Sequence, residues 1–217
     1  CALPILDIYN LLLAVPAILI ALTFHEFAHG YVAYRFGDPT AKNHGRLTLN
    51  PLAHLDPMGT IMIFLIHFGW AKPVPVDPRY LGNPKRDMMW IAAAGPLMNM
   101  ALALISGILI RIFIGVGLAS NQAGETAQIA FQMLYYSLYI NLALAFFNLL
   151  PIPPLDGSKI LAGVLPHRYT PTLYLIESKG PMVLFGIIMF GWITGFHVLG
   201  VVIGPFISVF SHLFSGI

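Results

Sequence analysis

Four stretches of this sequence are apolar enough, and long enough as helices, to cross a lipid bilayer, which takes about 20 such residues. They are residues 6–34, 88–118, 127–150 and 182–214, and glycines together with Pro205 leave open whether the last forms one helix or two. A fifth apolar run, residues 58–71, is short and suits a re-entrant or interfacial segment better than a full span. The sequence therefore predicts an all-α polytopic membrane protein with about four transmembrane helices plus a re-entrant segment.

Composition supports this fold class. Only 9% of the residues are charged, against about 25% in soluble domains. The net charge of +2 gives no support for a nucleic-acid surface, and we expect neither a nucleic-acid nor a nucleotide partner. We expect a single membrane domain over residues 1–217, with a core at about 6–161 and a C-terminal helical region at about 181–215.

Two segments between the first and second spans are expected to be irregular. Residues 45–51 alternate apolar and polar side chains and end in a proline, which predicts a short membrane-associated β strand or hairpin. Residues 70–78 contain three prolines, which exclude a helix and predict an extended loop.

The positions of the basic residues set the orientation. Residues 35–86 hold seven Lys and Arg, and the segment after the third span holds Lys159, Arg168 and Lys179, whereas residues 119–126 hold none. Because Lys and Arg favour the cytoplasmic side, the first span is expected to end in the cytoplasm. Only Arg111, near the outer end of the second span, disagrees. We therefore expect a multi-pass protein of the cell membrane.

The first span carries the sequence His25-Glu26-Phe27-Ala28-His29. Histidines four residues apart lie on one face of a helix, where both imidazoles can bind one Zn2+. The adjacent Glu26 is placed to act as general base toward a zinc-bound water. Ionisable residues inside a membrane span are costly and usually functional, so this pattern indicates a metal site more strongly here than in a soluble helix.

A catalytic zinc takes three protein ligands and a water, and the best third candidate is Asp156. It follows the third span in a segment that three prolines keep irregular, and irregular backbone at membrane depth is tolerated only inside protein or beside a wet cavity. The alternative is an ordinary loop in which Asp156 caps the next helix at Ser158. Asp156 can meet His25 and His29 only if the first and third spans run parallel, which requires residues 58–71 to re-enter rather than cross.

At these residues the chain resembles the site-2 protease family, the zinc proteases that cleave within the membrane. The motif HEFAH matches the first metal motif of that family, and Asn148 to Gly157, NLLPIPPLDG, matches the second. Residues 95–99, GPLMN, resemble a weaker feature, and residues 44–59 and 69–76 look like the short form of the family without a PDZ or CBS domain.

The resemblance implies a role for each matched residue. His25, His29 and Asp156 would bind one zinc ion, Glu26 would be the base, and Asn148 would hold substrate or stabilise the oxyanion. Candidate substrate-binding residues are Leu47, Thr48 and Leu49, on a strand that would pair with an unwound substrate, together with His54 and Asn99.

The remaining histidines have weaker assignments. His54 and His44 lie near the expected site and are either hydrogen-bonded structural residues or supports for the metal or substrate. Four others stand singly and are expected not to be ligands: His67, His167, His197 and His212.

The predicted function is zinc-dependent proteolysis of transmembrane-helix substrates within the bilayer. A membrane metal transporter would need ligands spread through the bilayer, whereas these candidates cluster at one depth. A catalytically inactive membrane adaptor would not need Glu26, because zinc binding alone does not require it.

Overall fold

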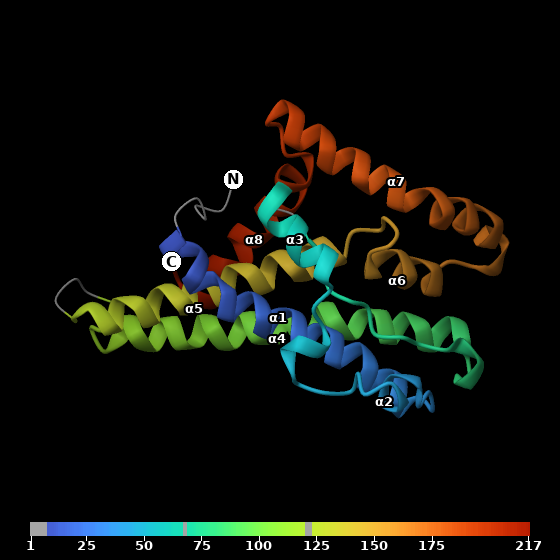
Figure 1. Cartoon of the computed structure of the whole chain (residues 1–217), viewed down its shortest axis with the longest axis horizontal. Helices are drawn as coiled ribbons and strands as arrows, with labels where there is room; N and C mark the ends of the chain where they lie inside the picture. The colour runs from blue at the N-terminus through green and yellow to red at the C-terminus, as the bar shows by residue number, and fades with distance from the viewer. Residues whose placement is uncertain (1–7, 67–68, 120–122) are drawn as a thin grey trace.

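Five long helices build the protein (Figure 1). The computed structural model describes residues 8–66, 69–119 and 123–217. Within these ranges the long helices are α1 (Ile8–Arg35), α4 (Pro84–Gly115), α5 (Glu125–Asn148), α7 (Thr170–Thr194) and α8 (Val198–Ser215). All five are long and apolar enough to cross a membrane. The protein is therefore a multi-pass membrane protein.

The expectation of about four spans is one too low, because the last apolar stretch forms two helices. α7 ends at Gly195, which has a left-handed backbone with φ of 73°. Glycine adopts this conformation without steric cost and commonly ends helices in this way. Pro205, by contrast, lies inside α8 without ending it.

The three helices α1, α4 and α5 form the centre of the molecule. α1 and α5 run in the same direction and α4 runs in the opposite direction (Figure 1). Ala14, Ala17 and Ala21 of α1 pack against Tyr136 and Ile140 of α5, and such small residues let membrane helices approach closely. α8 packs against α4 and α5, whereas α7 packs against α6 (Asp156–Val164), α8 and the 3-10 turn that precedes α7.

The short helix α3 (Pro57–Ile66) lies on the fifth apolar run, and it is not among the helices that could span a membrane. The chain before and after it is held together. Leu55 and Ala71 form an antiparallel bridge, and the Lys72 amide donates to the His54 carbonyl oxygen at 2.9 Å. The residues that flank α3 in the sequence therefore lie side by side.

The predicted strand at residues 45–51 is wrong. No strand occurs in the described ranges, where the Leu55–Ala71 bridge stands alone. Residues 45–51 form bends that lead into the 3-10 turn η1 (Pro51–Ala53), which the Asn50 side chain caps by accepting from the Leu52 amide at 3.1 Å. The turn chemistry of Asn50-Pro51 outweighs the period-two pattern, because no neighbouring strand is present to pair with this segment.

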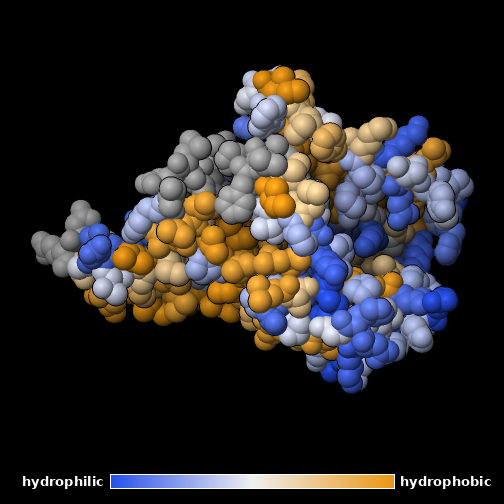
Figure 2. Space-filling model, viewed as in Figure 1, coloured by the Kyte–Doolittle hydropathy of each residue, from blue (hydrophilic) through white to orange (hydrophobic). Residues whose placement is uncertain are grey.

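Polar and apolar surfaces separate along the helix bundle. Figure 2 shows apolar side chains gathered over the left half of the view and polar ones over the right half. The right half holds the end of α1 with α2 (Thr40–Asn43), the start of α4, and α6 (Asp156–Val164) (Figure 1). The 3-10 turns η2 (Pro78–Tyr80) and η3 (His167–Tyr169) precede α4 and α7. The larger polar region thus lies at one end of the bundle, beside the candidate site.

Candidate metal centre

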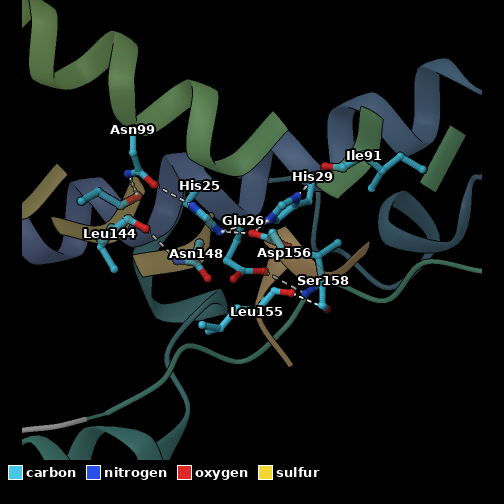
Figure 3. A network of polar contacts seen from close by, with 12 residues as sticks. His25, Glu26, His29, Ile91, Asn99, Leu144, Asn148, Leu155, Asp156 and Ser158 are labelled. Carbon is cyan, nitrogen blue, oxygen red and sulfur yellow. Dashed lines mark hydrogen bonds and ion pairs between the residues drawn. The ribbon is translucent and has the colours of Figure 1, made fainter. Parts of the chain in front are cut away.

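Two histidines of α1 face one another near the polar end of the bundle. His25 and His29 are 5% and 9% exposed, and their Nε2 atoms lie 3.0 Å apart (Figure 3). Their positions four residues apart place both rings on the side of α1 that packs against α4. The helical spacing alone therefore brings two potential ligand atoms together.

α4 fixes both rings from behind. The Nδ1 atom of His29 donates to the Ile91 carbonyl oxygen at 2.7 Å, and Nδ1 of His25 lies 2.6 Å from Oδ1 of Asn99. A carbonyl oxygen only accepts, so His29 carries its proton on Nδ1 and leaves the Nε2 lone pair free. Metal-binding histidines typically donate their second nitrogen in this way.

Gly95 lets α4 approach the two imidazoles. A Cβ atom at this position would collide with the Nε2 atoms of both His25 and His29. The α4 backbone therefore lies directly against the ligand atoms, and any side chain larger than hydrogen would move them.

Asp156 completes the cluster from the start of α6. Its Oδ2 atom lies 3.2 Å from Nε2 of His25 and 3.2 Å from Nε2 of His29, and it has no hydrogen-bond donor among the described residues. The neighbouring Gly157 packs so closely on the carbonyl oxygens of Leu149 and Leu150 that a Cβ would not fit. This contact holds the start of α6 against the end of α5.

The arrangement of the three atoms requires a positive charge between them. Oδ2 of Asp156 lies 3.2 Å from the Nε2 atom of each imidazole, and these two nitrogens lie 3.0 Å apart. Atoms that offer only lone pairs repel at this distance unless a proton or a metal cation lies between them.

The geometry fits a tetrahedral metal. Ligand atoms about 2.0–2.1 Å from zinc lie roughly 3.3 Å from one another, close to the 3.0 Å and 3.2 Å separations found here. Two imidazole nitrogens and one carboxylate oxygen are ligands that zinc commonly takes, with the fourth position left to water. Among the described residues this is the one cluster of three metal-ligand side chains.

A cavity of about 500 Å3 opens beside the cluster. Its wall is mainly apolar and includes Leu22 of α1, Ile91 of α4, Phe147 of α5 and Leu184 of α7. It is also lined by His25, His29 and Asp156. A ligand in this cavity would therefore touch the candidate metal position.

Glu26 lines the same cavity, and a proline-rich loop holds its carboxylate. Its Oε2 accepts from the Val74 amide at 2.9 Å. The loop is fixed in turn at Lys72, whose carbonyl oxygen accepts from Nη2 of the buried Arg46 at 2.6 Å. The extended loop expected at residues 70–78 therefore orients the candidate base, a role that the sequence analysis missed.

The other candidate residues are spread over three environments. Asn148 lines the cavity, and its Nδ2 donates to the Leu144 carbonyl oxygen at 3.0 Å. Asn99 is fully buried behind His25 and is not part of the described cavity wall. Leu47, Thr48 and Leu49 also lie outside that wall. The structure thus brings Asn148, but not the proposed substrate strand or Asn99, to the cavity.

The remaining histidines lie apart from the cluster. His54 is 1% exposed and its Nε2 contacts the Thr48 carbonyl oxygen at 2.8 Å. His44 is exposed, with Nδ1 at 2.9 Å from the Thr40 carbonyl oxygen. His167, His197 and His212 belong to no metal-ligand cluster among the described residues. His67 lies outside the described residues.

Comparisons with known proteins identify the family of this chain. The sequence profile described as Peptidase family M50 matches residues 13–130 and 114–189. "Putative zinc metalloprotease YwhC" of Bacillus subtilis (strain 168) is 40% identical over 200 residues, covering 92% of this chain and 90% of that protein. Rip2 of Mycobacterium tuberculosis (strain ATCC 35801 / TMC 107 / Erdman), with the same description, is 31% identical over 190 residues, covering 82% of this chain and 68% of that protein. No solved structure gives a significant match.

Proposed function

We propose, from the premise that this chain belongs to peptidase family M50, that His25, His29 and Asp156 hold its zinc and that Glu26 is its general base. The protein is a zinc metalloprotease that acts within the membrane. The observation that carries the assignment of ligands is the convergence of Nε2, Nε2 and Oδ2 at 3.0–3.2 Å inside a membrane protein.

The proposed chemistry uses groups that line one cavity. Zinc, when bound, supplies a Lewis acid and a water with a pKa of about 7. Glu26 takes the proton of the attacking water as its oxygen adds to the scissile carbonyl carbon, and then gives that proton to the leaving amide nitrogen. The products are a carboxylate and an amine. The Val74 amide holds one carboxylate oxygen of Glu26, which leaves the other free for this transfer.

Asn148 is the proposed stabiliser of the substrate oxyanion or of the bound substrate. It lies on the cavity wall with Glu26, and its Nδ2 has one bond, to the Leu144 carbonyl oxygen, among the described residues. An amide nitrogen carries two protons, so a second one is free to donate to a substrate oxygen. Such a donor stabilises the charge that develops on the oxygen in the transition state.

The size of the cavity indicates the state of the substrate. One turn of helix, 10–12 Å wide with side chains and 5.4 Å long, occupies roughly 500 Å3, and the cavity measures about 500 Å3. The cavity is therefore comparable in size with a short segment of peptide. Helical amides are also hydrogen-bonded and shielded, so the proposed substrate is a membrane segment unwound locally at the bond to be cut.

Metal removal tests the proposed function. Treating the purified protein with a chelator should abolish cleavage of a single-span membrane substrate, and added Zn2+ should restore it, because the attacking water depends on the metal. Mg2+, which prefers six oxygen ligands, should not restore it. Unchanged cleavage in a preparation shown to contain no metal would contradict a zinc-dependent mechanism.

The close approach at Gly95 gives a sharper prediction about metal geometry. Gly95→Ala should displace the His25 and His29 rings, and a misplacement of about 1 Å can cost roughly 100-fold in rate. Gly115→Ala is a matched control on the same helix, because a Cβ there meets no atom within 4 Å. Cleavage rate and zinc content of the two variants should be compared with wild type. Equal rates in both would mean that Gly95 does not set the ligand positions.

The active site is proposed to face the cytoplasm. Arg35, Lys42, Arg86 and Lys159 lie where α1 ends, α4 begins and α6 starts, which is the end of the bundle that carries the site (Figure 1). Basic residues favour the cytoplasmic side. Residues 58–71 are proposed to be re-entrant, which the Leu55–Ala71 bridge between their flanks supports.

Cysteine labelling tests this topology. In a Cys1→Ser background, Lys42→Cys and Arg79→Cys should both react with a membrane-impermeant thiol reagent from the cytoplasmic side. Val116→Cys, which replaces a residue that is 63% exposed beyond α4, should react only from the other side. Labelling of positions 42 and 79 from opposite sides would contradict re-entry.

A further inference from the structure

A chain of buried and partly buried polar side chains runs from His25 into the centre of the helix bundle. Its members are Asn99 and Ser106 of α4 and Asn141 and Ser137 of α5. Asn99 and Asn141 are both 0% exposed. Inside a membrane span no water satisfies such groups, and an unpaired buried amide is costly. Neither asparagine takes part in the proposed catalytic chemistry. Another role must therefore explain why two amides are buried here despite the free-energy cost.

The orientation of Asn99 is fixed by a backbone carbonyl. Its Nδ2 donates to the Ala21 carbonyl oxygen at 3.1 Å, and a carbonyl oxygen only accepts. The amide must therefore turn Oδ1 toward His25, where it lies 2.6 Å from Nδ1. His25 consequently carries its proton on Nδ1 and presents the lone pair of Nε2 to the metal position.

Asn141 is fixed by the same logic and supports Asn99. Its Nδ2 donates to the Ser137 carbonyl oxygen at 2.8 Å, so its Oδ1 is the atom left to accept from Nδ2 of Asn99, also at 2.8 Å. The two carbonyl oxygens of Ala21 and Ser137 thus set both amides. Ser106 lies at the far end, where its Oγ lies 2.9 Å from the Leu102 carbonyl oxygen and 2.8 Å from Oγ of Ser137. Because a carbonyl oxygen only accepts, the Ser106 hydroxyl donates to Leu102 and accepts from the Ser137 hydroxyl.

We infer that Asn99 and Asn141 are positioning residues, which act together to hold His25 in the tautomer and orientation that binds metal. The inference rests on the proposed zinc site. The two histidines differ in a useful way: His29 donates to the backbone at Ile91, whereas His25 depends on two side chains from two other helices. The ligand geometry at His25 is therefore coupled to the packing of α1, α4 and α5.

Zinc affinity tests the inference in a way that activity alone does not. We would measure affinity in the purified full chain by competition with a chelator, the absorption bands of the Co2+-substituted protein, and thermal unfolding with and without metal. Asn99→Leu should weaken zinc binding by about 10- to 100-fold, as loss of a partner behind a ligand typically does. Asn141→Leu should weaken it in the same direction by a smaller factor, and both should shift the Co2+ bands.

A conservative variant separates positioning from packing. Asn99→Asp keeps an acceptor for His25 Nδ1 but loses the donor to Ala21 and Asn141, so it should unfold more easily yet retain zinc affinity within about tenfold. Ser106→Ala removes the far end of the chain and should leave zinc affinity and the Co2+ bands unchanged.

Several results would overturn the inference. The first is a zinc affinity of Asn141→Leu equal to that of wild type. The second is an equal loss of zinc affinity in Asn99→Asp and Asn99→Leu. The third is a loss of zinc affinity in Ser106→Ala as large as that in Asn141→Leu. If Asn99→Leu does not fold, the comparison of Asn141→Leu with Asn99→Asp and Ser106→Ala decides the question. A wild-type protein that binds no zinc would instead overturn the proposed metal site.

Discussion

Glu26→Gln should lower turnover of a single-span membrane substrate by about 100- to 10,000-fold, the usual cost of losing a general base. The substitution keeps size and shape and removes only the ability to take a proton. The Gln oxygen can still accept from the Val74 amide, which contacts Oε2 at 2.9 Å in the wild type, so the loop should stay in place. No proposed ligand is changed, and zinc content should be equal to that of wild type.

The control for this variant is Glu125→Gln, which replaces an exposed glutamate in the first turn of α5, at the opposite end of the bundle. It should cleave at the wild-type rate. If the protein were a transporter, Glu26→Gln would still transport metal, and if it were an adaptor, Glu26→Gln would still bind its partner. For a protease, Glu26→Gln should lose turnover and still bind substrate. Equal rates for wild type and Glu26→Gln at equal zinc content would rule out Glu26 as the base.

Zinc itself should be lost when the proposed ligands are removed. Asp156→Asn is nearly isosteric but replaces the carboxylate oxygen that lies 3.2 Å from both imidazoles, and His25→Ala removes one imidazole. The bound metal should fall from near one ion per chain toward zero in the double variant His25→Ala, Asp156→Asn, and cleavage should disappear with it, because zinc in proteins takes at least three protein ligands.

Elemental analysis of the purified proteins measures this loss directly. His197→Ala is a suitable control, since His197 is exposed at the start of α8 and belongs to no metal-ligand cluster in the described residues. It should retain zinc at the wild-type level. Full zinc retention in the double variant would mean that the metal lies elsewhere.

The parts of the site that depend on local spacing were predictable from the sequence. His25 and His29 face the same way because four residues make about one helical turn, whatever surrounds them. Asp156 is distant in sequence, and its placement followed from topology: basic residues set the direction of each span, and the short run at residues 58–71 made α1 and α5 parallel. The structure brings its Oδ2 to both imidazoles.

The supports of the site could not be predicted, because they depend on how α4 and a loop pack on α1. The motif around Asn99 was visible in the sequence, but only the packing shows that its amide contacts His25 rather than the cavity. Gly95 matters because the α4 backbone touches the imidazoles. Val74 matters through its backbone amide, which every residue type except proline would provide.

The fold was predictable in class but not in two details. Hydropathy located α1, α4 and α5, whereas α7 begins at Thr170, before the apolar stretch at residues 182–214. The break in that stretch depends on which glycine adopts a left-handed backbone, and this is Gly195. The alternation in residues 45–51 predicted a strand, but alternation alone does not show whether a partner strand is available. A polar–apolar alternation carries weight only where a second strand can supply the hydrogen bonds.

The central claim is that one zinc ion lies between α1 and the start of α6, and the position of the metal in a crystal tests it most directly. An anomalous difference map collected at the zinc absorption edge should contain one strong peak per chain. We predict that it lies about 2.0–2.1 Å from Nε2 of His25 and of His29 and about 2.0–2.2 Å from a carboxylate oxygen of Asp156. A zinc-containing crystal whose peak lies away from these three side chains would contradict the account.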